Sequence, residues 1–509
     1  MIALSMLSCK KKETHWRTDV LVPILKTEMG LDDIFGAENI ASNADQSVSI
    51  VIEEDLNILS VDSVIDINDT VSVDIFNVPF TFTIPPGQKV IEKQTISKID
   101  FGAMELTKAR AKTANMKFYV TNSIKQPLLV KYELFSATQS GAIYEVEERV
   151  EAATDGQYSF AVKEIVLDDY DIDLSGPNHN AINTIYAKTT VWIHPNGDTA
   201  TVSPTDTVKI VSTFEKFVPD YAYGYLGTQQ LSAKSSSAIG VFNNFKSGSF
   251  DLENVNAYID VNNNLGVDVT VELTEIYTKN FSTNTLVNLN HSIVGSSLNI
   301  ERASESGIED FPVWAKHYKY DISNSNLDNM LEIMPDSFFI SVAGEINPLG
   351  NISAGNDFIY FDYGLNAKVK IEIPLNFSAT DMVFEDITKL VFDDESVISG
   401  ALNLFMENGY PFDLDIQFYI IDENNNVVDS LFSSKNTVVA ADVDQYDIVK
   451  SPKESILKVS LSPQLLINLK QNSNMLIRAK FNSSAHKNFT LYQDYSLNIK
   501  IVGDFEYEI

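Results

Sequence analysis

The chain has 509 residues, and 44% of them are hydrophobic, which supports folded domains and argues against intrinsic disorder. A chain of this length exceeds one hydrophobic core, so about three or four domains are expected. The formal net charge of −33 argues against nucleic acid and anionic lipid head groups as partners, because both require a basic surface.

The N-terminus carries the only cysteine of the chain, Cys9, directly after the apolar run of residues 1–8. An apolar run, a small residue and a lone cysteine are typical of a bacterial lipoprotein signal, which is cleaved before the cysteine that becomes lipidated. We therefore predict that residues 1–9 are a signal remnant ending in a lipidated Cys9, with the true start codon upstream of Met1. The alternative is that Cys9 is an ordinary residue of a disordered N-terminus.

The lone cysteine excludes disulfides within the chain and cysteine-ligated zinc. Outside the N-terminus, no segment has the roughly 18 to 20 apolar residues that a membrane-spanning helix needs. A lipidated Cys9 would therefore attach the protein to a membrane without a spanning segment.

Strand patterns dominate the rest of the chain. Runs rich in β-branched and aromatic residues are separated by clusters of Asn, Asp, Gly and Ser, as hairpin turns require. Examples are residues 47–52, 71–75, 128–134, 267–273, 367–373 and 414–421. Few windows have an apolar period near 3.6 residues, so we predict an all-β protein of tandem Ig-like β-sandwiches with short, scarce helices.

Three sequence elements recur in the same order along the chain, which indicates an internal repeat. The first is an Asn-bearing turn before a strand, at Asn122, Asn264 and Asn408. The second is a strand ending in a serine, at Ser175, Ser323 and Ser462, followed by apolar residues at helical spacing in 180–186, 327–331 and 464–469. The third is an Asp-Tyr pair, at 220–221, 362–363 and 494–495.

Together, the N-terminal signal and the repeat predict five segments. They are the signal remnant 1–9, a tether and N-terminal β region 10–100, and β-sandwich repeats at 101–247, 248–397 and 398–509. Each repeat is expected to carry one short crossover helix. Positions that recur in all three copies are best interpreted as scaffold, and a binding site would break the repeat.

Two Asn- and Asp-rich turns suggest calcium loops but fit poorly. The segment 260–266 spaces oxygen ligands two residues apart, yet its glycine is one place late and Val271 stands where an EF-hand has a bidentate Glu. The segment 422–426 fits a hairpin turn. We therefore expect no cofactor, and Ca²⁺ at residues 260–266 is the alternative.

No catalytic motif is recognisable in the chain, so we predict a protein that is not an enzyme. A glycosidase with dispersed carboxylates leaves no local motif and stays an alternative. Tyr221, Tyr223 and Tyr225 alternate along a predicted strand, so their rings would share one face as a sugar-stacking platform or, preferably, as packing. Trp192 and Trp314 fall at non-equivalent places of the repeat and are further candidates for ligand contact.

The N-terminal pattern resembles a large group of Bacteroidota lipoproteins. In this chain it consists of Cys9, the polar residues 10–15, a Trp-x-x-Asp-Val-x-x-Pro segment at 16–23 and the segment 26–36. The resemblance implies a lipidated cysteine, a tether, a strand and a short helix before β domains. Some similar lipoproteins are accessory subunits of outer-membrane machines for barrel assembly, secretion or nutrient uptake.

We therefore expect a non-enzymatic lipoprotein, lipid-anchored in the outer membrane, that acts as an accessory or scaffold subunit of an outer-membrane β-barrel complex. The alternative is a surface glycan-binding or adhesive lipoprotein. Lys10–Lys12 follow the cysteine where cell-surface lipoproteins of this phylum often carry acidic residues, so the cell surface and the periplasmic face both stay open.

Overall fold

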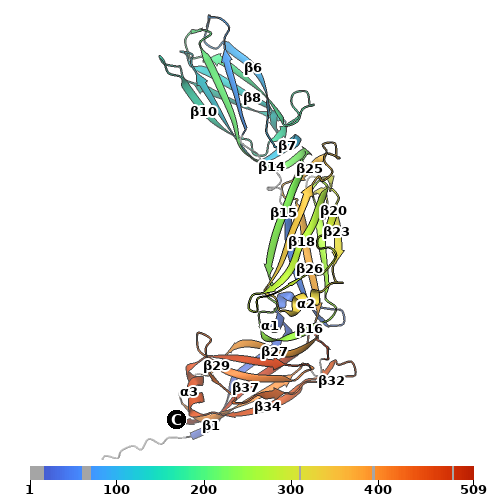
Figure 1. Cartoon of the computed structure of the whole chain (residues 1–509). Helices are drawn as coiled ribbons and strands as arrows, with labels where there is room; N and C mark the ends of the chain where they lie inside the picture. The colour runs from blue at the N-terminus through green and yellow to red at the C-terminus, as the bar shows by residue number, and fades with distance from the viewer. Residues whose placement is uncertain (1–16, 60–69, 309–310, 393–395, 484–486, 509) are drawn as a thin grey trace, which may run out of the picture.

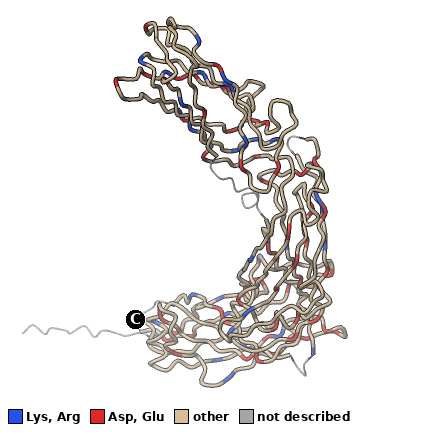
Figure 2. Tube along the Cα trace, turned by 45° about the horizontal axis from the view of Figure 1, so that its top comes forward, with Lys and Arg blue, Asp and Glu red and all other residues tan. Residues whose placement is uncertain are grey.

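The computed structural model describes residues 17–59, 70–308, 311–392, 396–483 and 487–508. These residues form three β-sandwiches in a row along a bowed molecule (Figure 1; Figure 2). Within these ranges the helices are short: α1 (Leu31–Phe35), η1 (Ala37–Asn39), α2 (Leu327–Glu332) and α3 (Pro463–Gln471). The predicted all-β class, built of tandem sandwiches, is confirmed.

We number the sandwiches first, second and third in the order of the repeats. The first contains β4 (Thr70–Asn77), β5 (Phe82–Ile84), β6 (Lys89–Lys98), β7 (Glu105–Asn122), β8 (Leu128–Gln139), β9 (Ala142–Val150), β10 (Ser159–Val166), β11 (Asp171–Asp173), β12 (Thr184–Ile193), β13 (Ala200–Val202) and β14 (Thr207–Tyr225). The second contains β2 (Ile40–Ser42), β3 (Val48–Leu59), β15 (Gln229–Ala238), β17 (Asn256–Asn263), β18 (Val269–Asn280), β19 (Thr285–Asn288), β20 (Ser297–Ile300), β21 (Ser304–Ile308), β22 (Phe311–Trp314), β23 (Lys316–Asp321), β24 (Ser337–Ile346), β25 (Asp357–Tyr360) and β26 (Leu365–Pro374). The third contains β1 (Arg17–Gly30), β16 (Phe245–Leu252), β27 (Asn376–Lys389), β28 (Val397–Asn408), β29 (Leu414–Ile421), β30 (Val427–Ser430), β31 (Asn436–Val438), β32 (Asp442–Val443), β33 (Val449–Ser451), β34 (Lys453–Ser460), β35 (Asn474–Phe481), β36 (Phe489–Thr490) and β37 (Ser496–Glu508).

One sheet has the same construction in every sandwich. Its strand order is β4–β14–β7–β10 in the first, β3–β26–β17–β23 in the second and β1–β37–β28–β34 in the third, with all neighbours antiparallel. The first strand of each order comes from the first 77 residues of the chain, and the other three come from the repeat itself. We call this the N-edge sheet.

The chain therefore runs out along all three sandwiches and then returns. β1 belongs to the third sandwich, β3 to the second and β4 to the first, after which the repeats lead back in the opposite order (Figure 1). This differs from the expectation of a separate β region at 10–100. The physical reason is that single strands have unpaired N–H and C=O groups on both edges and need a ladder to join.

The repeats also begin one strand earlier than the boundaries at 101, 248 and 398. β6 pairs with β12, β15 pairs with β24, and β27 pairs with β35, so each of these strands belongs to the sandwich that follows it. Near the N-terminus, β1 and α1 lie where the N-terminal pattern implied a strand and a short helix.

A buried asparagine ends the second strand of every repeat. Asn122, Asn263 and Asn408 are fully buried, and each side-chain oxygen accepts from the backbone N–H two residues later. Each side-chain amide donates to the carbonyl four residues later and to a carbonyl of a distant loop. The equivalent residue of the second copy is thus Asn263, one place before the Asn264 that the repeat predicted. The recurring asparagine satisfies backbone groups that the turn leaves without a ladder.

The crossover helices are present in only two repeats. α2 and α3 occupy the expected places, and Ser462 caps α3 by accepting from the N–H of Leu465 at 3.1 Å. In the first repeat the segment 180–186 is a turn followed by the start of β12. The turn is fixed by Asn183, which has a φ of +54° and whose buried side chain bonds the backbone of Leu106 and Met104.

The Asp-Tyr element is structurally equivalent in two copies only. Tyr363 and Tyr495 close matching turns, each donating its N–H to the carbonyl three residues before at 3.0 Å. Asp220 and Tyr221 instead lie within the long strand β14. The turn of the first sandwich that corresponds to the other two is closed by Asp206, so the match at Asp220 was coincidental.

The joint between the second and third sandwiches is packed with apolar rings. Phe35 of α1 contacts Phe245 with ring centroids 5.5 Å apart, and Phe250 approaches Phe377 at 6.4 Å. The Tyr410 hydroxyl donates to the carbonyl of Met29 at 2.9 Å, which ties the third repeat to the end of β1. This joint is an extension of the hydrophobic core.

The buried asparagines should carry part of the stability of each sandwich. We expect Asn263→Ala to lower the free energy of unfolding by about 2 kcal/mol or more, because it leaves buried backbone groups without partners. Denaturant unfolding of the full chain measures this. Asn262→Ala is the matched control, since the Asn262 side chain is on the opposite face of the same strand and should change stability little; equal losses would contradict the assignment.

The position of β1 predicts that an N-terminal substitution weakens the C-terminal sandwich. Ile24 is 1% exposed, and Ile24→Ala should cost about 2–5 kcal/mol. Limited proteolysis should then cleave the third sandwich first. Val20 of the same strand is 40% exposed and provides the control Val20→Ala. If β1 belonged to an independent N-terminal unit, the third sandwich would keep the protease resistance of the wild type.

Candidate functional site

The first and second sandwiches share a continuous sheet across their joint. β14 extends beyond the first sandwich and pairs with β25 of the second, placing Tyr221 opposite Tyr360 and Tyr223 opposite Phe358. On its other side, β14 pairs with β7, which places Arg110 opposite Tyr221. Backbone hydrogen bonds therefore connect the two sandwiches directly.

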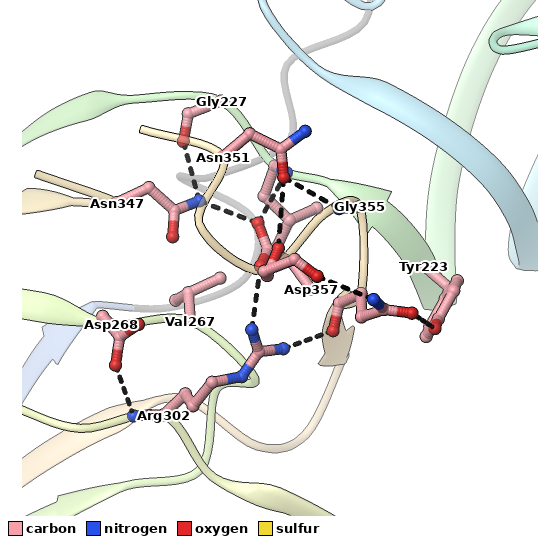
Figure 3. A network of polar contacts seen from close by, with 12 residues as sticks. Tyr223, Gly227, Val267, Asp268, Arg302, Asn347, Asn351, Gly355 and Asp357 are labelled. Carbon is pink, nitrogen blue, oxygen red and sulfur yellow. Dashed lines mark hydrogen bonds and ion pairs between the residues drawn. The ribbon is translucent and has the colours of Figure 1, made fainter. Parts of the chain in front are cut away.

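A buried carboxylate locks this joint (Figure 3). Asp357 is fully buried, and its oxygens accept from Arg302 Nη1 at 3.3 Å, Asn347 Nδ2 at 2.8 Å and the N–H of Leu226 at 3.1 Å. Asn347 also donates to the carbonyl of Gly227 at 3.1 Å. Leu226 and Gly227 directly follow β14, so the network holds the exit of the first sandwich against the second.

Beside this lock lies an open groove of about 680 Å³, which we call the joint groove. Its volume lies within the roughly 300–1,000 Å³ typical of small-molecule sites. Its lining comes from β7, β11, β14, β25, the hairpin β21–β22 and the turn after β25. The lining residues are Lys108, Arg110, Asp171, Asp220, Tyr221, Glu305, Gly307, Ile308, Pro312 and residues 360–363.

One carboxylate organises the aromatic part of the joint groove. Glu305 Oε1 accepts from the hydroxyls of Tyr221 at 3.1 Å and Tyr360 at 3.0 Å. The two rings lie 4.6 Å apart. Burial, reinforced by Glu305, raises the pKa of both phenols well above their usual range, so both stay protonated donors near neutral pH.

Three cations alternate along β7 at the joint groove. Lys108, Arg110 and Lys112 are exposed, while Ala109 and Ala111 between them are fully buried. Lys108 lies over the ring of Tyr221, and Lys112 lies 3.3 Å from the centroid of Phe361. The spacing follows from the two-residue period of a strand.

These cations keep unused donors. Arg110 reaches Asp220 only at 4.0 Å, and Lys112 reaches Asp362 at 3.6 Å. Within the described part of the chain, Lys108 forms no ion pair. Such long, exposed pairs hold the side chains weakly and leave them available to a ligand.

The structure brings some of the sequence candidates together and separates others. The Tyr221 and Tyr223 rings lie 6.5 Å apart at the joint, while the Tyr225 hydroxyl bonds Thr228 outside the groove. Trp314 is 55% exposed on the hairpin β21–β22, whose other side chains line the groove. Trp192 is half-buried near the opposite end of the first sandwich, on β12.

Sequence reasoning missed most of the joint groove. Glu305 is on β21, Tyr360 is on β25, and Lys108 and Arg110 are both on β7; no local motif marks the first two. The alternating Lys-Ala-Arg-Ala-Lys of residues 108–112, in a strongly acidic chain, was the one signal that could have pointed to it.

The segments considered for calcium serve the fold instead. The Asn263 amide is used within the protein, and a Cβ at Gly266 would come within 2.2 Å of the Phe358 ring, so glycine allows this close packing. Asp422 Oδ1 accepts from the backbone N–H of Asn424 and Asn426, which is a turn. Among the described residues, no group of three or more His, Cys, Asp or Glu side chains could hold a metal ion.

A Ser-His-Asp cluster near β11 has the wrong geometry for nucleophilic catalysis. Ser175 Oγ and Asp173 Oδ2 both approach Nδ1 of His179, at 3.1 and 3.0 Å. A catalytic triad needs the carboxylate and the hydroxyl on different ring nitrogens. Asp173 also accepts from Ser175 Oγ and N, so the cluster is a turn.

A second feature is an apolar patch on the N-edge sheet of the first sandwich. Val73, Val211, Tyr119 and Val162 form one row across its four strands. Ile75 and Phe160 stand at the two ends of the adjacent row. The exposed fractions are 50% for Val73, 58% for Ile75, 36% for Tyr119, 77% for Phe160 and 45% for Val162. We call these six residues the distal face.

The equivalent rows of the other sandwiches differ in chemistry. In the second sandwich the row is Asp55, Lys368, Asp260 and Lys319, an alternation of charge in which Lys368 pairs with Asp55 at 3.6 Å. In the third it is Lys26, Lys500, Phe405 and Ile456, which is half charged and half apolar. Because the register is the same, the apolar row of the first sandwich is not required by the fold.

Comparison with known proteins identifies no family. No protein-family model matches the chain, and no curated protein does. Among solved structures, a protein of Parabacteroides distasonis that is assigned as secreted matches with a TM-score of 0.28 and 16% identity, covering 54% of this chain and 82% of its own. The pentameric VP1 of Washington University polyomavirus matches with a TM-score of 0.06 and 11% identity, covering 43% and 99%.

Neither TM-score supports a functional argument. The resemblance of the N-terminal pattern to Bacteroidota lipoproteins therefore stays a prediction. No helix in the described ranges is long and apolar enough to cross a membrane. Cys9 lies outside the described residues.

The lock at Asp357 predicts a stability effect at the joint. Asp357→Ala leaves Arg302 without its buried partner and should cost about 3–5 kcal/mol. Calorimetry of the full chain measures the loss, and proteolysis between β14 and β15 reports opening of the joint. Asp155, whose side chain is 91% exposed and pairs with Lys125, gives the control Asp155→Ala, which should change stability little. Equal effects of the two variants would show that Asp357 does not lock the joint.

Proposed function

We propose that this protein is a non-enzymatic outer-membrane lipoprotein that serves as an accessory or scaffold subunit of an outer-membrane β-barrel complex. The observation that carries the proposal is the distal face. It is an apolar surface at a register position where the second sandwich has alternating charges.

An exposed apolar sheet face supports a protein partner. Exposed apolar patches with a polar rim are typical of protein–protein contacts, and aromatic side chains are enriched at their centres. Tyr119 and Phe160 supply rings. Lys117 and Glu164 border the face in the next row, and the polar Lys209 and Thr121 lie between Ile75 and Phe160. Burying these side chains against a partner would remove apolar area from water, which is the main driving force of association.

The path of the chain indicates which sandwich would lie nearest a lipid anchor. β1 begins at Arg17, whose backbone lies opposite Glu508 in the ladder of the third sandwich. Cys9 is eight residues earlier, so a lipidated Cys9 would lie within roughly 30 Å of that strand even with an extended tether. The third sandwich would then be nearest the membrane, and the first would be at the other end of the arc (Figure 2).

The proposal asks only for binding. The Ser-His-Asp cluster near β11 lacks triad geometry, because Ser175 Oγ and Asp173 Oδ2 both approach Nδ1 of His179. An accessory subunit that braces or covers a barrel complex needs only an anchor, a rigid body and a contact surface.

Affinity purification from native membranes in mild detergent tests the proposal. The tagged wild type should recover a β-barrel protein in stoichiometric amount, and the double variant Phe160→Thr, Val162→Thr should reduce recovery about tenfold or more. Threonine keeps the β-strand preference, so the sandwich stays folded. Recovery of the lipoprotein alone in mild detergent would refute the scaffold function.

A matched control uses an exposed apolar pair elsewhere. Val427 and Val428 on β30 of the third sandwich are 53% and 43% exposed. The double variant Val427→Thr, Val428→Thr should recover the barrel protein like the wild type. An equal loss in both double variants would show that the distal face is not the contact surface.

A further inference from the structure

We infer that the joint groove is a binding site for a neutral oligosaccharide. This goes beyond the scaffold function, because the groove lies at the opposite end of β7 from the distal face and uses different side chains.

The first argument is the contrast between the two joints. The joint between the second and third sandwiches is filled with phenylalanine rings, and the cavity left there is only about 20 Å³. The joint between the first and second sandwiches leaves a groove of about 680 Å³ and lines it with tyrosines and ionisable groups. The same chain thus closes one joint with apolar packing and keeps the other open and polar.

The second argument is the aromatic surface. Tyr221 contacts Tyr360 with ring centroids 4.6 Å apart, and Tyr360 contacts Tyr363 at 6.2 Å. All three rings line the joint groove and are only partly buried. A pyranose presents a face of C–H groups that packs on aromatic rings, so a series of rings along a groove suits a chain of sugars.

The third argument is the pattern of donors and acceptors, which decides the ligand's charge. The groove mixes the cations Lys108 and Arg110 with the carboxylates Asp171, Asp220, Glu305 and Asp362, and Lys112 stands at its end. An anionic ligand would meet four carboxylates, and a cationic ligand would meet three cations. Hydroxyl groups both donate and accept, so an uncharged polyol can satisfy the two kinds of group at once.

Glu305 and Lys108 are the two polar groups best prepared for such a ligand. The hydroxyls of Tyr221 and Tyr360 fix Glu305 through Oε1, and within the described part of the chain Oε2 has no hydrogen-bond partner. Lys108 is held near the Tyr221 ring without an ion pair. A ligand hydroxyl can therefore donate to Glu305 and another can accept from Lys108 while a sugar ring packs on the tyrosines.

Isothermal titration of the full chain in detergent tests the inference. The probes are tetrasaccharides of β-1,4-linked glucose, xylose and mannose, with tetragalacturonate as the acidic counterpart and a chitosan tetramer as the cationic one. We expect a neutral probe to bind, with an affinity that changes less than about twofold between 50 mM and 500 mM salt, because no net charge is neutralised.

Three variants assign the binding to the groove. Glu305→Gln keeps an acceptor for the two tyrosines but removes the charge, and should weaken binding about tenfold. Tyr221→Ala should weaken binding about tenfold or more. Tyr221→Phe keeps the ring and should weaken binding less, so the two variants together separate the effect of stacking from that of a folding defect. Tyr446→Ala is the control, because Tyr446 is 73% exposed in the third sandwich and far from the groove in sequence and sheet.

Several results would overturn the inference. They are binding of tetragalacturonate or chitosan in preference to every neutral probe, no binding of any neutral probe, or binding that Glu305→Gln and Tyr221→Ala leave unchanged. None of these results bears on the distal face, so failure here is distinguishable from failure of the scaffold function.

Discussion

The antiparallel pairing between β1 and β37 is the constraint on which the architecture depends. It joins residues at the two ends of the chain, from Arg17 with Glu508 to Gly30 with Ser496. Once β1 is in the third sandwich, the following strands must cross the second and reach the first before the repeats can return. Every N-edge sheet is thereby completed by a strand from the first 77 residues. The three sandwiches are therefore parts of one interlocked unit, and a tether at the N-terminus would act on the sandwich made by the C-terminus.

The repeat gives each sandwich the same backbone and leaves its surfaces free to differ. Asn122, Asn263 and Asn408 fix the same turn in all three copies, and the strand register around them is the same. Side chains at equivalent outward positions are then apolar in the first sandwich, charged in the second and mixed in the third. The two joints differ in the same way, one closed by phenylalanine rings and the other open and polar. Function is thus expected where the copies differ.

Local sequence patterns were sufficient to predict the features that depend only on residues close together in the sequence. Two-residue alternation and turn residues indicated strands. A recurring asparagine turn indicated a structural role, and the buried asparagine amides do bond the backbone of these turns. The patterns failed where contacts with residues distant in the sequence determine the local structure. The segment 180–186 has helical spacing, but Asn183 bonds β7 and makes a turn. Tyr221, Tyr223 and Tyr225 alternate as expected, yet only the first two meet at the joint. The ladder between β14 and β25 stops at the pair of Gly224 with Asp357, one residue before Tyr225.

By itself, the sequence determined the strand content, the threefold repeat, the scaffold role of the recurring asparagine turns and the strong acidity. The tertiary structure alone decided which strands are neighbours, and therefore that residues 17–77 are shared among three sandwiches. It also decided that Glu305, Tyr360 and Lys108 meet in one groove. The physical reason is that side-chain alternation specifies which face of a strand is buried but not which backbone completes its ladder. That choice depends on contacts between residues that are hundreds of positions apart.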